Sequence, residues 1–151
     1  MIKKIKVSDN DVIFDNIVIG KYVNEGGIEN ILKKEPSRIV RNINTILIYD
    51  DEGLYFYTSK KGESEISQID IQMEIQHWLA FAPHSKYNGK FYIRDKEIQS
   101  LDDLLGLGDD ILNTDELDGD GNIKIYLNRI SLDININSET RALQNISIWY
   151  L

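Results

Sequence analysis

The stretch from Ile46 to Tyr57, which reads ILIYDDEGLYFY, decides the fold. Two runs of alternating apolar residues flank the polar tetrad at 50–53 (DDEG), whose last residue, Gly53, tolerates a positive φ. This pattern is typical of an antiparallel hairpin closed by a short turn. The sequence therefore predicts a β-hairpin at this position.

A second stretch, 123–134 (IKIYLNRISLDI), repeats the first at an offset of 77 residues. It sets Ile46 over Ile123 and Tyr49 over Tyr126. The same offset persists downstream, where it pairs Ile66, Ile69, Ile71 and Met73 with Leu143, Ile146, Ile148 and Tyr150. We interpret the repeat as an internal duplication in which the two hairpins are equivalent.

Strand signals also precede each hairpin. Ile5 and Val7 indicate an edge strand near the N-terminus. The apolar runs 12–14 and 17–19 flank Asp15-Asn16, two residues that tolerate the left-handed conformation of a tight turn. In the second half, Phe91 and Ile93 match Ile17 and Ile19 at an offset of 74. A strand pair is therefore expected at the start of each half.

A short helix is predicted after each strand pair. Ile28, Ile31 and Leu32 have one-sided helical spacing, and the helix should end before Pro36. The matching apolar residues of the second half, at an offset of 73, are Leu101, Leu104 and Leu105. Ser100 with the acidic residues that follow resembles a capping box, and Gly106 or Gly108 should end this second helix.

Each half thus reads as two strands, a short helix and three antiparallel strands. Two such pseudo-symmetric halves in tandem predict an α+β fold, mainly antiparallel sheet with helices on one face. We expect a single compact domain over 1–151, with a first repeat half at 12–73, a junction at 74–86 and a second half at 87–151.

The composition is that of an ordinary soluble globular protein, with 42% hydrophobic and 28% charged residues among 151. The chain has no cysteine and no apolar segment long enough for a membrane span, so we expect a cytoplasmic protein. The net charge of −8 argues against nucleic acid and anionic membranes as partners, because both are bound through basic surface. A basic partner is expected instead.

The acidic charge is concentrated in one loop of the second half. The offset rises from 73 at the helix to 77 at the hairpin, so the second half contains four additional residues between these elements, within 108–122. The loop supplies the predicted partner-binding residues Asp109, Asp110, Asp115, Glu116, Asp118 and Asp120. Insertions and function both concentrate in loops, so the loop either binds a partner or only keeps the protein soluble.

Metal and catalytic motifs give little support for other chemistry. Glu116-x-Asp118-x-Asp120-Gly121 follows the calcium-loop spacing, but the twelfth position is Leu127 where a bidentate glutamate is required. The sequence contains no zinc-protease, nucleophile-elbow or phosphate-loop motif and no cysteine nucleophile. We therefore predict no metal, no cofactor and no enzymatic activity.

Tyrosines at strand spacing raise the possibility of an interface. Tyr49, Tyr55, Tyr57 and Tyr126 belong to the two hairpins, so some of them must face solvent or a partner. Cross-strand packing is one explanation, and an interface, where tyrosine is enriched, is the other.

The turn Tyr49-Asp50-Asp51-x-Gly53-Leu54, and Pro83 followed by the Tyr87-Asn88-Gly89 entry into a second copy, resemble small bacterial proteins that accompany polymorphic and contact-dependent toxin systems. The acidic, cysteine-free profile is also similar to the immunity proteins of such systems. The resemblance implies a cytosolic immunity protein that binds and neutralises a cognate toxin, such as a basic nuclease. The alternatives are a non-catalytic structural or dimerisation module and a small enzyme whose site is unrecognised.

Overall fold

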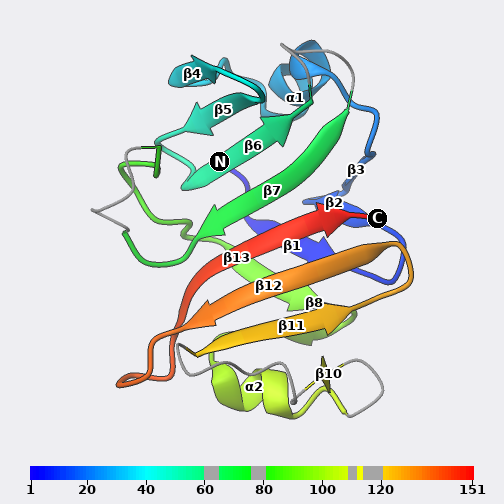
Figure 1. Ribbon diagram of the computed structural model, residues 1–151, viewed down its shortest axis with the longest axis vertical. Coiled ribbons are helices and arrows are strands. Elements are labelled where there is room, and N and C mark those ends of the chain that lie inside the picture. Colours follow the sequence, from blue (N-terminus) through cyan, green and yellow to red (C-terminus); the bar gives the residue numbers. More distant parts are fainter. Residues whose placement is uncertain (60–64, 76–80, 109–111, 114–120) are drawn as a thin grey trace.

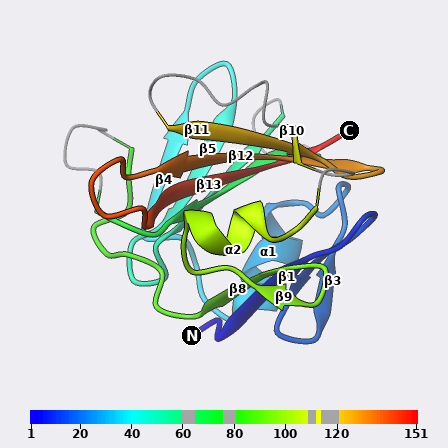
Figure 2. The ribbon, with the colours of Figure 1, turned by 90° about the horizontal axis from the view of Figure 1, so that it is seen from below.

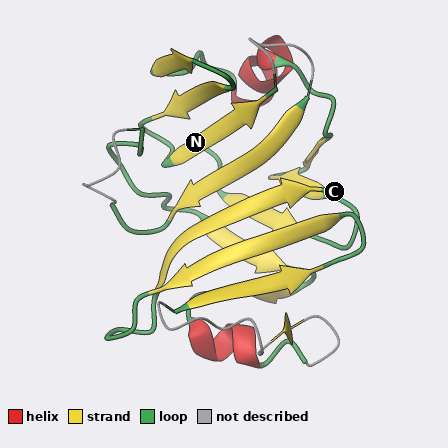
Figure 3. Cartoon of the chain, in the orientation of Figure 1, coloured by secondary structure: helices red, strands yellow, loops and turns green. Residues whose placement is uncertain are grey.

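In the computed structural model, two β-sheets face each other, and both helices lie on the same side of the larger sheet as the smaller sheet does (Figures 1 and 2). The structure describes residues 1–59, 65–75, 81–108, 112–113 and 121–151. Helix α1 lies toward one end of the larger sheet and α2 toward the other (Figure 3). The predicted α+β class and the predominance of antiparallel sheet are confirmed.

The elements alternate between short strand pairs, one helix and longer meanders. Before residue 76 they are β1 (Lys4–Val7), β2 (Val12–Phe14), β3 (Ile17–Ile19), α1 (Glu25–Leu32), β4 (Arg38–Arg41), β5 (Thr45–Tyr49), β6 (Leu54–Thr58) and β7 (Ile66–Gln72). After it they are β8 (Lys90–Ile93), β9 (Lys96–Glu97), α2 (Leu101–Leu105), β10 (Leu112–Asn113), β11 (Asn122–Tyr126), β12 (Ile130–Ile136) and β13 (Leu143–Tyr150).

The larger sheet has eight strands in the order β10-β11-β12-β13-β7-β6-β5-β4, and the smaller has five in the order β3-β2-β1-β8-β9. Among the described strands, only β1 and β8 pair in parallel. The two long meanders meet at the antiparallel pair β7–β13, in the middle of the larger sheet. The main core fills the space between the sheets, and its largest fully buried side chains include Tyr49, Phe14, Phe56 and Phe91.

Both predicted helices form, and each has local capping. The side chain of Asn24 accepts a hydrogen bond from Gly27 N–H at 2.8 Å at the start of α1, which ends well before Pro36. Ser100 is the N-cap residue of α2, but its side chain makes no capping bond. Instead, Asp103 accepts a hydrogen bond from the backbone N–H of Gln99 at 2.8 Å. Gly106 ends this helix, as predicted.

The first strand was wrongly expected at an edge. Strand β1 lies inside the smaller sheet, antiparallel to β2 and parallel to β8, with Ile5 and Val7 fully buried. Alternation of apolar and polar residues reveals one buried face, but it does not reveal how many neighbours the strand has. The same limit explains why β4 and β10, at the two edges of the larger sheet, were not expected as strands.

Both predicted hairpins form, but the offset of 77 assigns their faces incorrectly. Leu47 and Tyr49 face the main core, whereas Ile46 and Ile48 belong to a small cluster on the opposite face of the sheet. In the second hairpin it is Ile123, the residue matched to Ile46, that faces the core. A register change of one residue exchanges the two faces of a strand. The sequence concealed this because β5 is buried on both faces.

Core-facing residues align at offsets of 76 and 78. Leu47 and Tyr49 of β5 then match Ile123 and Ile125 of β11, while Leu54 of β6 matches Leu132 of β12. The second hairpin is consequently one residue pair longer at its tip. Between β7 and β13 the offset of 77 does preserve the face, because Ile69, Ile71, Ile146 and Ile148 all lie in the main core.

The turn of the first hairpin is a buried junction rather than an exposed loop. Glu52 is 3% exposed, and its carboxylate pairs with Lys34 Nζ at 2.8 Å and accepts a hydrogen bond from Ile2 N–H at 3.0 Å. Burial alone would raise the pKa of Glu52, but these contacts hold it below its usual value. Beside it, Gly53 has φ of 69° and lies against the backbone of Lys86 and Tyr87.

Gly53→Ala should therefore destabilise the protein strongly. The left-handed backbone alone costs about 1–3 kcal/mol for a residue with a Cβ atom, and the new methyl group would overlap the 86–87 backbone. Urea unfolding measures the loss. The matched control is Gly20→Ala, since the nearest atom to a Cβ there is Val23 Cγ2 at 3.9 Å. Equal stability of the two variants would contradict this account of the turn.

Candidate functional site

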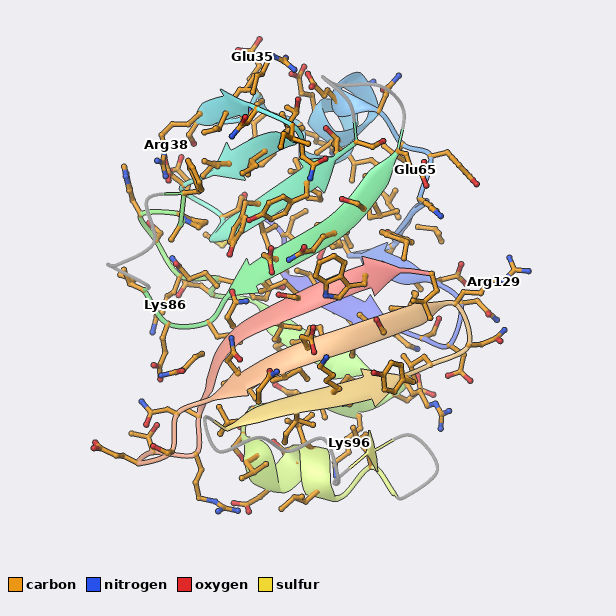
Figure 4. The ribbon with its side chains drawn as sticks, in the orientation of Figure 1. Glu35, Arg38, Glu65, Lys86, Lys96 and Arg129 are labelled. Atoms are coloured by element: carbon orange, nitrogen blue, oxygen red, sulfur yellow. The ribbon has the colours of Figure 1, made fainter. Side chains whose placement is uncertain are left out.

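The outer face of the eight-stranded sheet, which points away from the smaller sheet, carries three ordered rows of side chains (Figure 4). Neighbouring strands lie about 4.8 Å apart, so the members of one row are in reach of one another. From β11 toward β4, the central row is Lys124, Asp133, Ser147, Asp70, Tyr55, Ile48 and Arg38. The rows on either side are Tyr126, Ser131, Trp149, Gln68, Tyr57, Ile46 and Val40, and Asn122, Asn135, Asn145 and Gln72.

The two ends of this face differ in exposure. Over β5 and β6 the side chains are buried, with Ile48 at 0% and Tyr55 at 6% exposure. Over β11 and β13 large aromatic side chains are open to solvent, with Tyr126 at 48% and Trp149 at 38%. Of the four hairpin tyrosines, Tyr55, Tyr57 and Tyr126 lie on the outer face, and among these only Tyr126 is largely exposed to solvent.

The exposed aromatic side chains form the walls of a slot. Tyr126, Ser131 and Trp149 are direct cross-strand neighbours, so the small Ser131 leaves a gap between the two rings about 10 Å wide at the backbone. A cavity of about 130 Å³ occupies this gap. Its lining, which defines the Tyr126–Trp149 slot, is Lys124, Tyr126, Ser131, Leu132, Asp133 and Trp149.

The slot contains one carboxylate and one ammonium group. Asp133 and Lys124 are cross-strand neighbours, yet no ion pair joins them at 4.0 Å or less. Within the described part of the chain, the Asp133 carboxylate accepts no hydrogen bond. The slot therefore offers an available anionic acceptor in the row next to its two aromatic walls, with a cation beside it.

A buried carboxyl group lies at the centre of the outer face. Asp70 is 1% exposed and accepts hydrogen bonds from Gln68 Nε2 at 2.7 Å, from Asn145 Nδ2 at 3.5 Å and from Ser147 Oγ. Burial raises the pKa of Asp70 from 3.8 to about 6, the hydrogen bonds from Ser147 and Gln68 oppose the rise, and the charge of Asp133 adds to it. Asn145 Oδ1, close by, is buried with no hydrogen-bond partner among the described residues.

The opposite corner of the sheet, near the β5–β6 turn, is covered by the chain's own connecting segment. Gln72 Nε2 donates hydrogen bonds to the carbonyl groups of Pro83 at 2.7 Å and Ser85 at 2.8 Å, and Gln72 O accepts one from Tyr87 N–H at 2.7 Å. Asp50 accepts a hydrogen bond from His84 N–H at 2.9 Å. A bent segment of connecting backbone thus docks at this end of the outer face.

The residues predicted from sequence as the binding site lie outside the described residues. These are Asp109, Asp110, Asp115, Glu116, Asp118 and Asp120. At the end of the calcium-like pattern, Leu127 is 7% exposed and faces the core, so it supplies no metal ligand. In the described part of the chain, no three His, Asp or Glu side chains are placed to hold a metal ion.

Sequence reasoning missed the slot and the Asp70 cluster. Tyr126, Ser131 and Trp149 come from three strands, and only the register brings them together. A partial signal did exist, since Asp70 stands between Ile69 and Ile71 and Asp133 between Leu132 and Ile134. Such alternation marks a polar outer face, but it does not show that a carboxyl group on that face is buried.

Comparison with known proteins identifies the family. The chain belongs to the family described as a domain of unknown function, DUF7738, whose model matches residues 4–104. The Tyr126–Trp149 slot lies beyond the matched residues. No curated protein matches the chain.

One similar solved structure is a cysteine-rich secretory protein from Staphylococcus aureus subsp. aureus Mu50, with a TM-score of 0.42 and 15% sequence identity. The similarity covers 87% of this chain and 46% of that structure, so the chain spans about half its length. Neither helix in the described residues has the length and apolar character that a membrane crossing requires.

Asp70→Asn should stabilise the protein at pH 7. The folded protein holds the pKa of Asp70 at about 6, above 3.8, so the ionised carboxylate costs up to about 3 kcal/mol at pH 7, and lowering the pH toward 4 removes this cost. An amide avoids the cost, and its Nδ2 can donate to Asn145 Oδ1. When the pH is lowered from 7 to 5, the unfolding free energy of wild type should rise by about 1 kcal/mol relative to that of the variant.

Urea unfolding at pH 7 and pH 5 measures this difference. Glu139→Gln, at an exposed position, serves as a control for the loss of one carboxylate. Parallel pH dependence of wild type and Asp70→Asn would show that Asp70 does not titrate in this range.

Proposed function

We propose that the protein is a non-catalytic binding protein that neutralises a cognate, basic bacterial toxin. The observation that carries the proposal is the open half of the outer face, where Tyr126 and Trp149 are exposed beside an available carboxylate, Asp133. Exposed aromatic residues are enriched at protein interfaces. The toxin as partner comes from the resemblance to immunity proteins.

The net charge of −8 supports a basic partner. Complementary charge accelerates encounter and excludes wrong partners more than it adds affinity. An acidic protein that covers a cationic active-site cleft would block the access of phosphate-bearing substrates to it. We assign this steering role to the acidic loop at 109–120.

The surroundings of Asp70 favour binding over catalysis. A general base must come within hydrogen-bonding distance of the proton it removes. Asp70 is 1% exposed, and Gln68 and Ser147 already occupy its two oxygen atoms. We therefore assign Asp70 to the interior of the sheet rather than to a reaction.

We also propose that the two halves are related by duplication, with the approximate two-fold axis between β7 and β13. The strand order of the larger sheet supports this, since β6, β5 and β4 follow β7 as β12, β11 and β10 follow β13. Register irregularities also occur at comparable places, at Tyr57/Thr58 and at Asn135/Ile136. In the smaller sheet, β2 and β8 lie on either side of β1.

A dimerisation module is the second candidate. Strand β4 is an edge of the larger sheet, and Ile39 and Ile43 near it are 44% and 86% exposed. An open edge with apolar side chains is a template for pairing with another chain. Arg38 and Arg41 at the ends of β4 disfavour such pairing, because charged edge residues oppose it. The molar mass in solution decides between a monomer and a dimer.

Reversal of the acidic loop should weaken toxin neutralisation. The variant carries Asp115→Lys, Glu116→Lys, Asp118→Lys and Asp120→Lys. Surface changes usually cost under about 0.5 kcal/mol each, so the variant should fold. Its association with the toxin encoded by the adjacent gene should slow by about tenfold or more at low salt. Binding kinetics and growth rescue measure the effect.

A matched control reverses four exposed acidic residues elsewhere: Asp11, Glu35, Asp51 and Glu139. Asp50 and Glu52 are unsuitable as controls, because both are ion-paired and Glu52 is buried. Equal protection by the loop variant and wild type would remove the steering role of the loop. If wild type fails to bind the toxin, the immunity function itself is wrong.

A further inference from the structure

We propose that the Tyr126–Trp149 slot binds a basic peptide segment of the partner protein. The inference rests on the proposed function and on the correspondence of the two halves. All six lining residues lie on β11, β12 and β13.

The first step of the argument is the corner of the sheet that corresponds to the slot. With the offsets that preserve the core face, Tyr126 corresponds to Asp50, Ser131 to Gly53 and Trp149 to Gln72. These three first-half positions lie under the connecting segment 82–87, which contacts Asp50 and Gln72 through its backbone. In Figure 4, Lys86 of this segment lies at the left edge of the sheet, and Arg129, in the turn between β11 and β12, lies at the right edge. One corner of the face is thus occupied by the connecting chain, and its counterpart is a slot.

The second step is the chemistry of the occupied corner. The docked segment is bent, and Gln72 Nε2 binds the carbonyl groups on both sides of His84. At the slot, an indole replaces this amide and a phenol replaces the carboxylate of Asp50. Aromatic walls bind a peptide through the faces of its side chains and its backbone rather than through paired hydrogen bonds. The slot therefore suits a peptide segment with less dependence on the exact position of its carbonyl groups.

The third step is charge. Asp133 lines the slot, in the row next to that of the two rings, and accepts no hydrogen bond within the described part of the chain. A lysine or arginine side chain that enters between Tyr126 and Trp149 would gain cation–π contact with the rings and a charge-assisted hydrogen bond to Asp133. Lys124 opposes this entry by repulsion. The net charge of −8 favours the same kind of partner.

Nuclear magnetic resonance titration of the full chain tests the proposal without the toxin. The probe is the capped heptapeptide FAPHSKY, the chain's own sequence at 81–87, which docks at the corresponding corner and carries two basic side chains. At millimolar concentration it should shift the backbone amide signals of Tyr126, Ser131 and Trp149. A capped FAPESEY peptide, with both basic side chains replaced by glutamate, should not.

Variants of the slot give opposite expected results. Asp133→Asn should weaken peptide binding about tenfold, since a hydrogen bond to a charged group is lost. Lys124→Gln should strengthen it severalfold, because it removes the repulsion. Trp149→Ala should abolish the shifts, and Tyr126→Ala provides the same test if loss of the indole unfolds the protein. Glu139→Gln is the control and should bind like wild type.

Three results would overturn the proposal: no shift at the slot with FAPHSKY, equal shifts with FAPESEY, or slot shifts with chitotriose but with neither peptide. The last would make the slot a glycan site. Because the titration contains no toxin, it fails or succeeds separately from the immunity function. A toxin that binds wild type and Trp149→Ala equally would leave the protein as an inhibitor but place its interface elsewhere.

Discussion

The antiparallel pairing of β7 with β13 is the contact on which the rest of the molecule depends. Each strand ends a meander, and their pairing joins two four-stranded units into one sheet. Ile69 and Ile71 meet Ile148 and Ile146 on the core side of this junction, while Asp70 meets Ser147 on the outer side. The core side contributes apolar burial, and the outer side contributes a carboxyl group in a position that disfavours its charge. The protein therefore carries an electrostatic penalty at the seam that its apolar packing offsets.

Much of the local structure could be predicted from the sequence, because it is determined by local signals. Pro36 limits α1, Asn24 caps it, and Asp15 adopts the left-handed conformation that its hairpin turn requires. Both long hairpins were located from their alternation and their turn residues. These features depend on backbone preferences within a few residues, which a single sequence contains.

What could not be predicted depends on which face of a strand is turned inward and on which strands are neighbours. Strand β5 is buried on both faces, so its sequence did not show which residues face the main core. An error of one residue in the alignment therefore exchanged the two faces of the hairpin. The Tyr126–Trp149 slot needs three strands in register, and the burial of Glu52 needs Lys34 and the N-terminal segment folded over the turn. Non-local pairings of this kind leave no signal in composition or spacing.

The internal position of β1 has a consequence for synthesis on the ribosome. Its parallel neighbour β8 is separated from it by more than half of the chain, and the neighbour of β7 in the centre of the larger sheet, β13, comes last of all. Until these strands emerge, a nascent chain that has folded its first part presents two unpaired strand edges, those of β1 and β7. Such edges are templates for pairing with other chains. The order of the strands thus makes the nascent chain a natural client of chaperones that shield exposed β-edges.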